Sequence, residues 1–142
     1  MYVVIGGASG LGAAWTEYMI RTYQAHIIWL GRREQDTEIS EQIARMGASA
    51  PRYIQADITD STSLQQAYDT IKDKHAVIHG VVHSALVLAD KSLQQMDEST
   101  FQASLAPKVA GTVYLAEIFG QDKLDFMPVS YTHLTLPTIL LV

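Results

Sequence analysis

The sequence predicts an α/β fold in which a doubly wound parallel sheet carries flanking helices and is incomplete at its C-terminal end. Short apolar segments of four to eight residues, typical of buried parallel strands, begin at residues 2, 26, 53 and 76. Segments with helical spacing of apolar residues separate them, and a glycine-rich turn joins the first strand to the first helix. This alternation of strand and helix is the order that produces a parallel sheet covered on both faces.

The composition is that of a globular domain and argues against several kinds of partner and site. The chain has 142 residues, 48% hydrophobic and 18% charged, which is enough for one globular domain with a core. Its net charge of −5 argues against a nucleic-acid partner, and the absence of cysteine excludes disulfides and thiolate ligands. No segment approaches the roughly 20 apolar residues of a membrane helix, and no signal peptide is evident. We therefore expect a cytoplasmic protein without a membrane partner.

The segment that organises the chain is the glycine turn after residues 2–5. Strand, glycine turn and helix are the opening of a Rossmann-like dinucleotide-binding unit. Glycine lets backbone approach a pyrophosphate and accepts positive φ, while the N-terminus of the next helix offers free N–H groups to phosphates. Glycine turns also occur without a ligand, so the later segments must show whether this turn binds a dinucleotide. The predicted cofactor-binding residues here are Gly6, Gly7, Ala8, Ser9, Gly10, Leu11 and Gly12.

The first helix is predicted over residues 10–23 and the second strand over 26–30. The apolar helix residues are expected to lie on the sheet, which makes Trp15 and Tyr18 core residues. The set comprises Leu11, Ala14, Trp15, Tyr18 and Met19.

The end of the second strand predicts the type of cofactor. An NAD site places an acid about 20 residues past the glycine turn to bind the ribose hydroxyls. This sequence has Gly31, Arg32 and Arg33 there. An arginine at this point can pair with the 2′-phosphate of NADPH. The alternative is that both arginines are ordinary surface charge, but the preceding turn favours NADPH, with Arg32 as the first candidate and Arg33 as the second.

A helix is predicted over residues 37–46, ended by Gly47, and a third strand over 53–56. Asp57, directly after this strand, is predicted to accept a hydrogen bond from the adenine amino group, with Ile58 beside it. Asp60 or Ser61 is interpreted as the N-cap of a helix over residues 63–74.

The fourth strand is predicted over residues 76–83. Small residues at its C-terminal end would let a cofactor pass closely, so His83, Ser84 and Ala85 are predicted to bind the cofactor. The histidines lack partners at metal-ligand spacing, and no metal site is predicted.

A long helix follows over residues 97–119, with Asp97 as N-cap and Pro107 expected to kink or split it. Lys108 lies beside this irregularity, where an inward orientation is plausible, although a surface lysine is the default interpretation. A fifth strand is predicted to begin at residues 124–127 and to be interrupted by Pro128.

These segments resemble the short-chain dehydrogenase/reductase superfamily and, more narrowly, the ketoreductase domain of modular polyketide synthases. The matching segments are IGGASGLG (5–12), LGRR (30–33), ADITD (56–60), GVVHSALVLAD (80–90) and LAPKVAGTVYL (105–115). The resemblance implies NADPH-dependent reduction of a β-ketoacyl thioester on an acyl carrier protein, beside other domains of a multidomain synthase. It also implies that Lys108 is catalytic, orienting a tyrosine and lowering its pKa.

The sequence departs from the family pattern at several positions. Ile5 replaces a threonine, and Leu86 replaces a glycine and could crowd the nicotinamide side. Residues 88–90 keep the last acid, Asp90, of a Leu-Asp-Asp motif but have Ala89 in its middle. A serine-bearing strand end and a Tyr-x-x-x-Asn helix are not found. Tyr68 and Lys72 have the spacing of the catalytic pair, but they precede the fourth strand and are interpreted as structural.

The last residues lose the alternation of strand and helix, and SYTHLTLPT (130–138) resembles a translated adapter or vector sequence. We therefore expect residues 1–130 to be the NADPH-binding portion of a ketoreductase domain. Residues 131–142 are expected to be a non-family tail produced by cloning or sequencing. This chain alone is expected to be inactive, and the alternative is a noncatalytic NADPH-binding or structural Rossmann-like domain. A sheet cut at its fifth strand is also expected to expose an apolar edge and to be poorly soluble.

Overall fold

The computed structural model describes residues 1–89, 91–92 and 94–130, so Asp90 and the tail 131–142 lie outside the described residues. At its centre is a parallel sheet in the order β3-β2-β1-β4, which confirms the predicted α/β architecture. The order steps outward from β1 in both directions, as in a doubly wound sheet. The strands are β1 (Tyr2–Ile5), β2 (Ile27–Gly31), β3 (Arg52–Gln55) and β4 (Gly80–His83).

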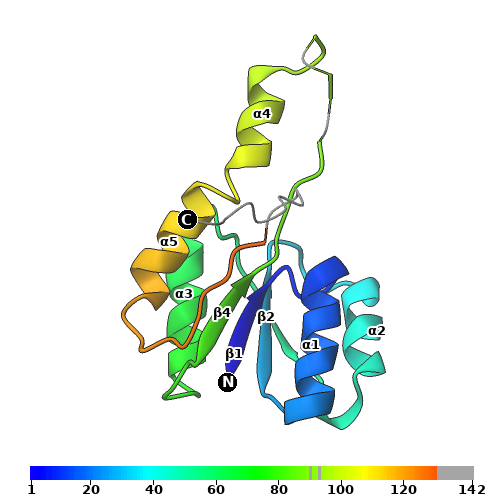
Figure 1. Ribbon diagram of the computed structural model, residues 1–142, viewed down its shortest axis with the longest axis vertical. Coiled ribbons are helices and arrows are strands. Elements are labelled where there is room, and N and C mark those ends of the chain that lie inside the picture. Colours follow the sequence, from blue (N-terminus) through cyan, green and yellow to red (C-terminus); the bar gives the residue numbers. More distant parts are fainter. Residues whose placement is uncertain (90, 93, 131–142) are drawn as a thin grey trace, which may run out of the picture.

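The helices lie on both faces of the sheet. Figure 1 shows α1 and α2 on one side, and α3 and α5 on the other. A 3-10 turn, Gly47–Ser49, follows α2 and begins with Gly47 at φ +74°, which supports the predicted stop. The four helices are α1 (Gly10–Tyr23), α2 (Thr37–Arg45), α3 (Ser61–Lys72) and α5 (Ala110–Phe119).

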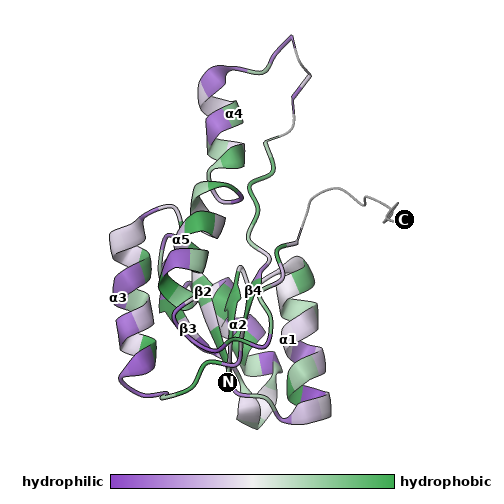
Figure 2. Ribbon diagram, turned by 60° about the vertical axis from the view of Figure 1, so that its left-hand side comes forward, coloured by the Kyte–Doolittle hydropathy of each residue, from purple (hydrophilic) through white to green (hydrophobic). Residues whose placement is uncertain are grey.

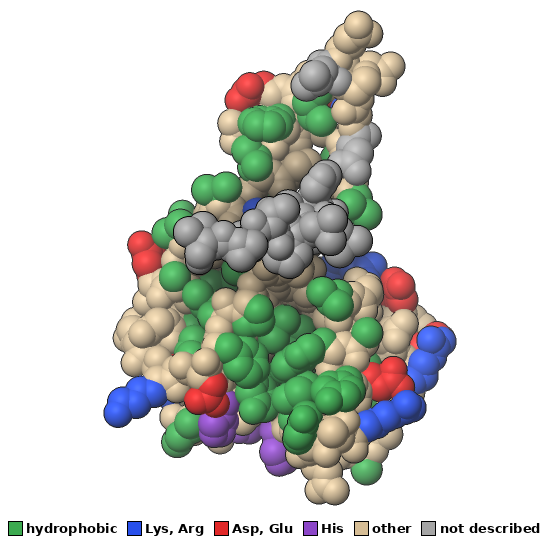
Figure 3. Space-filling view, viewed as in Figure 1, with side chains coloured by type: hydrophobic (Ala, Val, Ile, Leu, Met, Phe, Trp, Pro, Cys, Tyr) green, Lys and Arg blue, Asp and Glu red, His purple; other side chains and the backbone are tan. Residues whose placement is uncertain are grey.

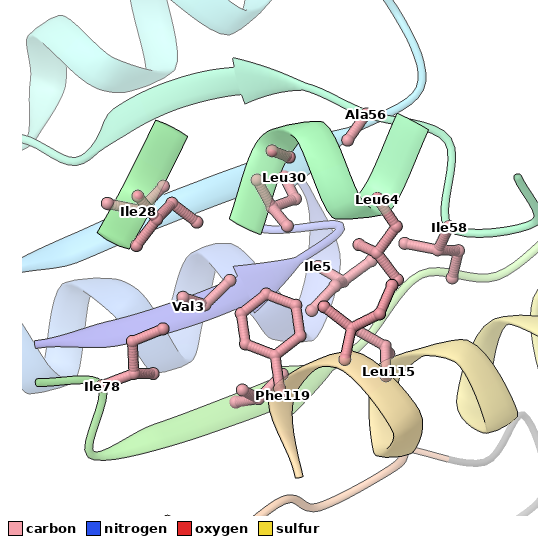
Figure 4. Close-up of a cluster of buried hydrophobic side chains, with 14 residues drawn as sticks. Val3, Ile5, Ile28, Leu30, Ala56, Ile58, Leu64, Ile78, Leu115 and Phe119 are labelled. Carbon is pink, nitrogen blue, oxygen red and sulfur yellow. The ribbon is translucent and has the colours of Figure 1, made fainter. Parts of the chain in front are cut away.

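The larger core cluster fills the space between the sheet and the α3/α5 layer. Phe119 and Leu115 of α5 meet Leu64 of α3 above the strand residues Val3 and Ile5, as Figure 4 shows. All five side chains are at most 1% exposed. Full burial of such a side chain contributes about 1.5–3 kcal/mol, so this layer holds the sheet in the position that the site requires.

The face that α1 presents to the sheet differs from the prediction. Gly12, Thr16 and Ile20 are buried, whereas Leu11, Ala14 and Tyr18 are exposed and Trp15 and Met19 are partly buried. Tyr18, predicted to be core, is 56% exposed. The reason is that small residues allow close helix–strand approach, and the buried Thr16 hydroxyl accepts a hydrogen bond from the Trp29 indole at 2.9 Å.

The predicted long helix is divided at Pro107, as expected. The first part is α4 (Glu98–Leu105), capped by the Asp97 carboxylate, which accepts from the Thr100 N–H at 2.8 Å. Proline lacks the N–H that would continue the helical hydrogen bonds. In Figure 1, α4 projects from the body, and Figure 2 shows its hydrophobic and hydrophilic residues interspersed.

Residues 125–130 run parallel to β4 and form the beginning of the predicted fifth strand. Isolated bridges pair Gly80 with Phe126 and His83 with Val129. Pro128 has no N–H to donate, but its carbonyl accepts from the His83 N–H at 2.9 Å. This segment therefore pairs along β4 and itself forms the edge of the described sheet on this side. The expected exposure of an apolar edge stays a prediction. β4 also begins at Gly80 rather than at residue 76.

Candidate functional site

A cavity of about 530 Å³ lies at the C-terminal ends of the four strands. Its walls come from the glycine turn after β1, the loop after β2, the segment after β3 and the segment after β4, which is where parallel α/β sheets bind ligands. Twelve of the predicted cofactor-binding residues line it: Gly6, Gly7, Ala8, Ser9, Gly10, Leu11, Arg32, Arg33, Asp57, Ile58, Ser84 and Ala85.

The glycine turn leaves no room for a side chain at Gly6, Gly7 or Gly12. Gly6 and Gly10 have φ values of +74° and +53°. A Cβ on Gly7 would lie 2.1 Å from the Trp29 ring, and one on Gly12 would lie 2.5 Å from Ser84 Oγ. These contacts explain why the turn is built from glycine, and Gly12 lies behind the cavity wall rather than in it.

The N-terminus of α1 has the features of an anion site. Its N-cap residue Ser9 makes no side-chain hydrogen bond to the helix, and its first turn contains no acidic residue. The first N–H groups of a helix have no partner within the helix, and the helix dipole favours negative charge there. Since this turn also lines the cavity, its backbone can hold a phosphate.

Ser84 holds the glycine turn against the end of β4. Its hydroxyl donates to the carbonyl of Ile5 at 2.7 Å, and its N–H donates to the same carbonyl at 3.0 Å. The backbone of Ala85 lies against Gly6, where a Cβ would approach to 2.8 Å. The second contact explains why position 6 is a glycine, because a side chain there would collide with the backbone after β4.

The two arginines after β2 have different surroundings. The Arg33 guanidinium lies 3.4 Å from the Asp36 carboxylate and 3.3 Å from that of Glu38. Arg32 forms no ion pair with any residue of the described chain, and it lines the cavity. Arg32 is therefore the cation of this loop that is open to an anionic ligand.

Asp57 lies in a turn after β3. Its Oδ1 accepts from the Thr59 N–H at 2.9 Å and from the Thr59 hydroxyl at 2.7 Å, while its own N–H donates to Ser63 Oγ at 3.1 Å. Asp60 caps α3 by accepting from the Thr62 N–H at 3.0 Å, which confirms its predicted role. Asp57 is thereby held at the cavity wall.

His83 and Lys108 stand behind the cavity. The buried His83 ring donates from Nε2 to the Pro107 carbonyl at 2.8 Å, and burial lowers its pKa, so it is neutral. This bond secures the break between α4 and α5. The Lys108 ammonium points inward and donates to the Ser130 carbonyl, and burial lowers its pKa. Pro107 and Ser130 line the cavity, whereas His83 and Lys108 do not.

Tyr68 and Lys72 lie on the α3/α5 side and have a structural role, as interpreted from the sequence. The Tyr68 hydroxyl donates to Asp122 at 3.0 Å, and the Lys72 ammonium lies 2.7 Å from the same carboxylate. The pair joins α3 to the loop after α5, and neither residue lines the cavity.

Sequence reasoning missed Tyr53, which lines the cavity and whose hydroxyl donates to the Arg33 carbonyl at 2.6 Å. Its place in a strand was predictable, but its contact with the loop after β2 depends on the register between β2 and β3. Leu86 also lines the cavity. In the described part of the chain no three His, Asp or Glu side chains gather as a metal site. None of the described helices has the length and apolarity to cross a membrane.

The fold and the position of the cavity together define a Rossmann-like α/β domain. The family model described as "KR domain" matches residues 1–132, and the chain belongs to this family. It is 51% identical over 130 residues to polyketide synthase PksN of Bacillus subtilis, covering 89% of this chain and 2% of that protein. It is 43% identical over 129 residues to polyketide synthase ThaG of Burkholderia thailandensis, with the same coverage. This chain therefore spans a small part of the length of these relatives.

Solved structures give the same family. The structure of an N-terminal ketoreductase from the macrolactin assembly line matches with a TM-score of 0.79 and 27% identity, over 89% of this chain and 26% of that chain. A ketoreductase domain from the bacillaene assembly line matches with a TM-score of 0.79 and 25% identity, over 89% and 31%. The predicted resemblance to polyketide synthase ketoreductases is confirmed.

Proposed function

We propose that this chain is the NADPH-binding portion of a ketoreductase domain of a polyketide synthase. The parent domain would reduce a β-ketoacyl thioester carried by an acyl carrier protein, in the cytoplasm and beside other synthase domains. Membership of the family supports the reaction class. The observation that carries the choice of cofactor is Arg32, which lines the cavity without an ion-pair partner in the described chain, at the position where an NAD site has an acid.

The residues present fit the cofactor. Backbone N–H groups of the glycine turn and the uncapped start of α1 would hold the pyrophosphate. Arg32 would pair with the 2′-phosphate, and Asp57 would accept from the adenine amino group with Ile58 beside the ring. Ser84 and Ala85 line the same cavity and would lie against the cofactor. When bound, NADPH supplies the hydride.

Lys108 is proposed to act on a proton donor. Its inward ammonium, one residue from the cavity-lining Pro107, would stabilise a tyrosinate and orient the nicotinamide ribose. Among the described residues, the one tyrosine that lines the cavity is Tyr53, and its hydroxyl is bonded to the Arg33 carbonyl. This supports a chain that binds NADPH without turnover, and it equally favours the alternative of a noncatalytic binding domain. That residues 131–142 are a foreign tail is part of the same proposal and rests on their sequence alone.

The test is to titrate the purified chain with NADPH and with NADH, following cofactor fluorescence, and then to add a β-ketoacyl thioester. We expect saturable NADPH binding, weaker NADH binding, and no thioester-dependent loss of absorbance from NADPH. Turnover at the rate of an intact ketoreductase would contradict the assignment of a missing proton donor. Failure to bind either nucleotide, with native circular dichroism, would instead favour a structural domain.

A further inference from the structure

Two side chains of β3 reach across to the loop that carries the arginines. The Tyr53 hydroxyl donates to the carbonyl of Arg33 at 2.6 Å, and the Gln55 amide Nε2 donates to the carbonyl of Arg32 at 3.1 Å. Both carbonyls of the Arg32-Arg33 dipeptide are therefore held by the neighbouring strand.

The register of the sheet explains this arrangement. Gly31 of β2 is aligned with Gln55 of β3, and Trp29 is aligned with Tyr53. Residues two apart on a strand lie on the same face, so Tyr53 and Gln55 reach the same side of the loop. Tyr53 lies directly against Gly31, where a Cβ would be 2.5 Å from the phenol oxygen. A glycine at the end of β2 is thus what allows the phenol to pass over to Arg33.

The side chains of the loop are held as well. Asp36 and Glu38 occupy the Arg33 guanidinium, and β3 occupies the backbone, so the Arg32 guanidinium is the group left for a ligand. Burial raises the pKa of Tyr53, so its hydroxyl stays protonated and remains a donor at neutral pH. Holding a loop before the ligand arrives lowers the entropy that binding must remove.

We propose that Tyr53 and Gln55 are positioning residues that set the selectivity for a 2′-phosphorylated nucleotide by fixing the backbone that presents Arg32. The proposal rests on NADPH being the cofactor. It assigns to β3 a part in cofactor choice through contacts with the loop, although neither side chain has to touch the phosphate.

The experiment compares Tyr53→Phe and Gln55→Leu with the unchanged chain in titrations with NADPH and NADH. Tyr53→Phe keeps the ring over Gly31 and removes one hydrogen bond. The matched control is Tyr68→Phe, which removes a phenol hydrogen bond to Asp122 on the opposite face of the sheet. Thermal unfolding of all four proteins records any general loss of structure.

We expect each β3 variant to bind NADPH about fivefold more weakly, as for the loss of one hydrogen bond, with NADH affinity unchanged. Tyr68→Phe should leave the NADPH-to-NADH affinity ratio unchanged even where it lowers the melting temperature. An NADPH-to-NADH affinity ratio that stays unchanged in Tyr53→Phe, including the case in which both affinities fall equally, would overturn the proposal. If the unchanged chain shows no preference for NADPH over NADH, the proposed cofactor itself is wrong. That outcome is distinguishable from a failure of the positioning role, because it appears without any substitution.

Discussion

At the scale of single residues, the site depends on positions where a side chain is missing. Gly7 lies under the Trp29 ring, and Trp29 in turn is held by its hydrogen bond to Thr16 of α1. The turn, β2 and α1 therefore meet at one point. A methyl group at Gly7 would have to displace the indole or lift the turn away from the sheet.

We therefore expect Gly7→Ala to lower the free energy of unfolding by about 1–3 kcal/mol, the cost of overpacking a filled site, and to weaken nucleotide binding. Urea unfolding of Gly7→Ala in the original and in a Trp29→Phe background gives the coupling between the two residues. A smaller loss in the Trp29→Phe background is the predicted result. Equal losses in both backgrounds would show that the indole contact is not the cause.

At the scale of elements, His83 connects β4 to the break between α4 and α5. Its Nε2 donates to the Pro107 carbonyl, and its Nδ1 is buried without a partner in the described structure. Burial disfavours the charged ring, so the pKa of His83 in the folded protein is below its ordinary value of 6.5. The unfolded chain then binds more protons than the folded one as the pH falls through this interval.

The sign of the effect follows from that difference. The contribution of His83 to stability is complete above about pH 6.5 and declines as the pH falls towards the lowered pKa, by about 1.4 kcal/mol for each pH unit between the unfolded and folded pKa values. Gln at position 83 retains an amide donor but does not titrate. We expect the melting temperature of the original chain to fall more than that of His83→Gln when the pH is lowered from 7.5 to 5.5. A constant difference would contradict a neutral, buried His83.

The features that could be predicted from the sequence are those that depend on neighbouring residues in the chain. The glycine turn, the arginine pair, the caps at Asp60 and Asp97 and the break at Pro107 depend on local chemistry, and local sequence revealed them. The buried face of α1 did not follow from its apolar residues, because close packing against the sheet selects small residues such as Gly12 and Thr16. The hydrogen bonds from Tyr53 and Gln55 to the loop after β2 depend on the register between β2 and β3, which residue spacing alone does not determine.

At the scale of the whole molecule, the described chain is a sheet with a ligand cavity at one end and a projecting arm formed by α4. Figure 3 shows hydrophobic side chains gathered over the middle of the body. Exposed apolar residues such as Phe101, Val109 and Val113 lie on α4, between α4 and α5, and on α5. Poor solubility of the isolated chain thus remains a prediction, although residues 125–130 cover the edge of β4.

If Arg32 pairs with the 2′-phosphate of NADPH in this cavity, affinity measurements on Arg32→Ala should reveal it. The matched control is Arg52→Ala, which removes an exposed arginine at the other end of the sheet, where β3 begins. We predict that Arg32→Ala weakens NADPH binding by about tenfold or more, as for a charge-assisted hydrogen bond, and leaves NADH binding unaffected, while Arg52→Ala changes neither affinity. Equal NADPH affinity in Arg32→Ala and Arg52→Ala would show that Arg32 does not bind the 2′-phosphate.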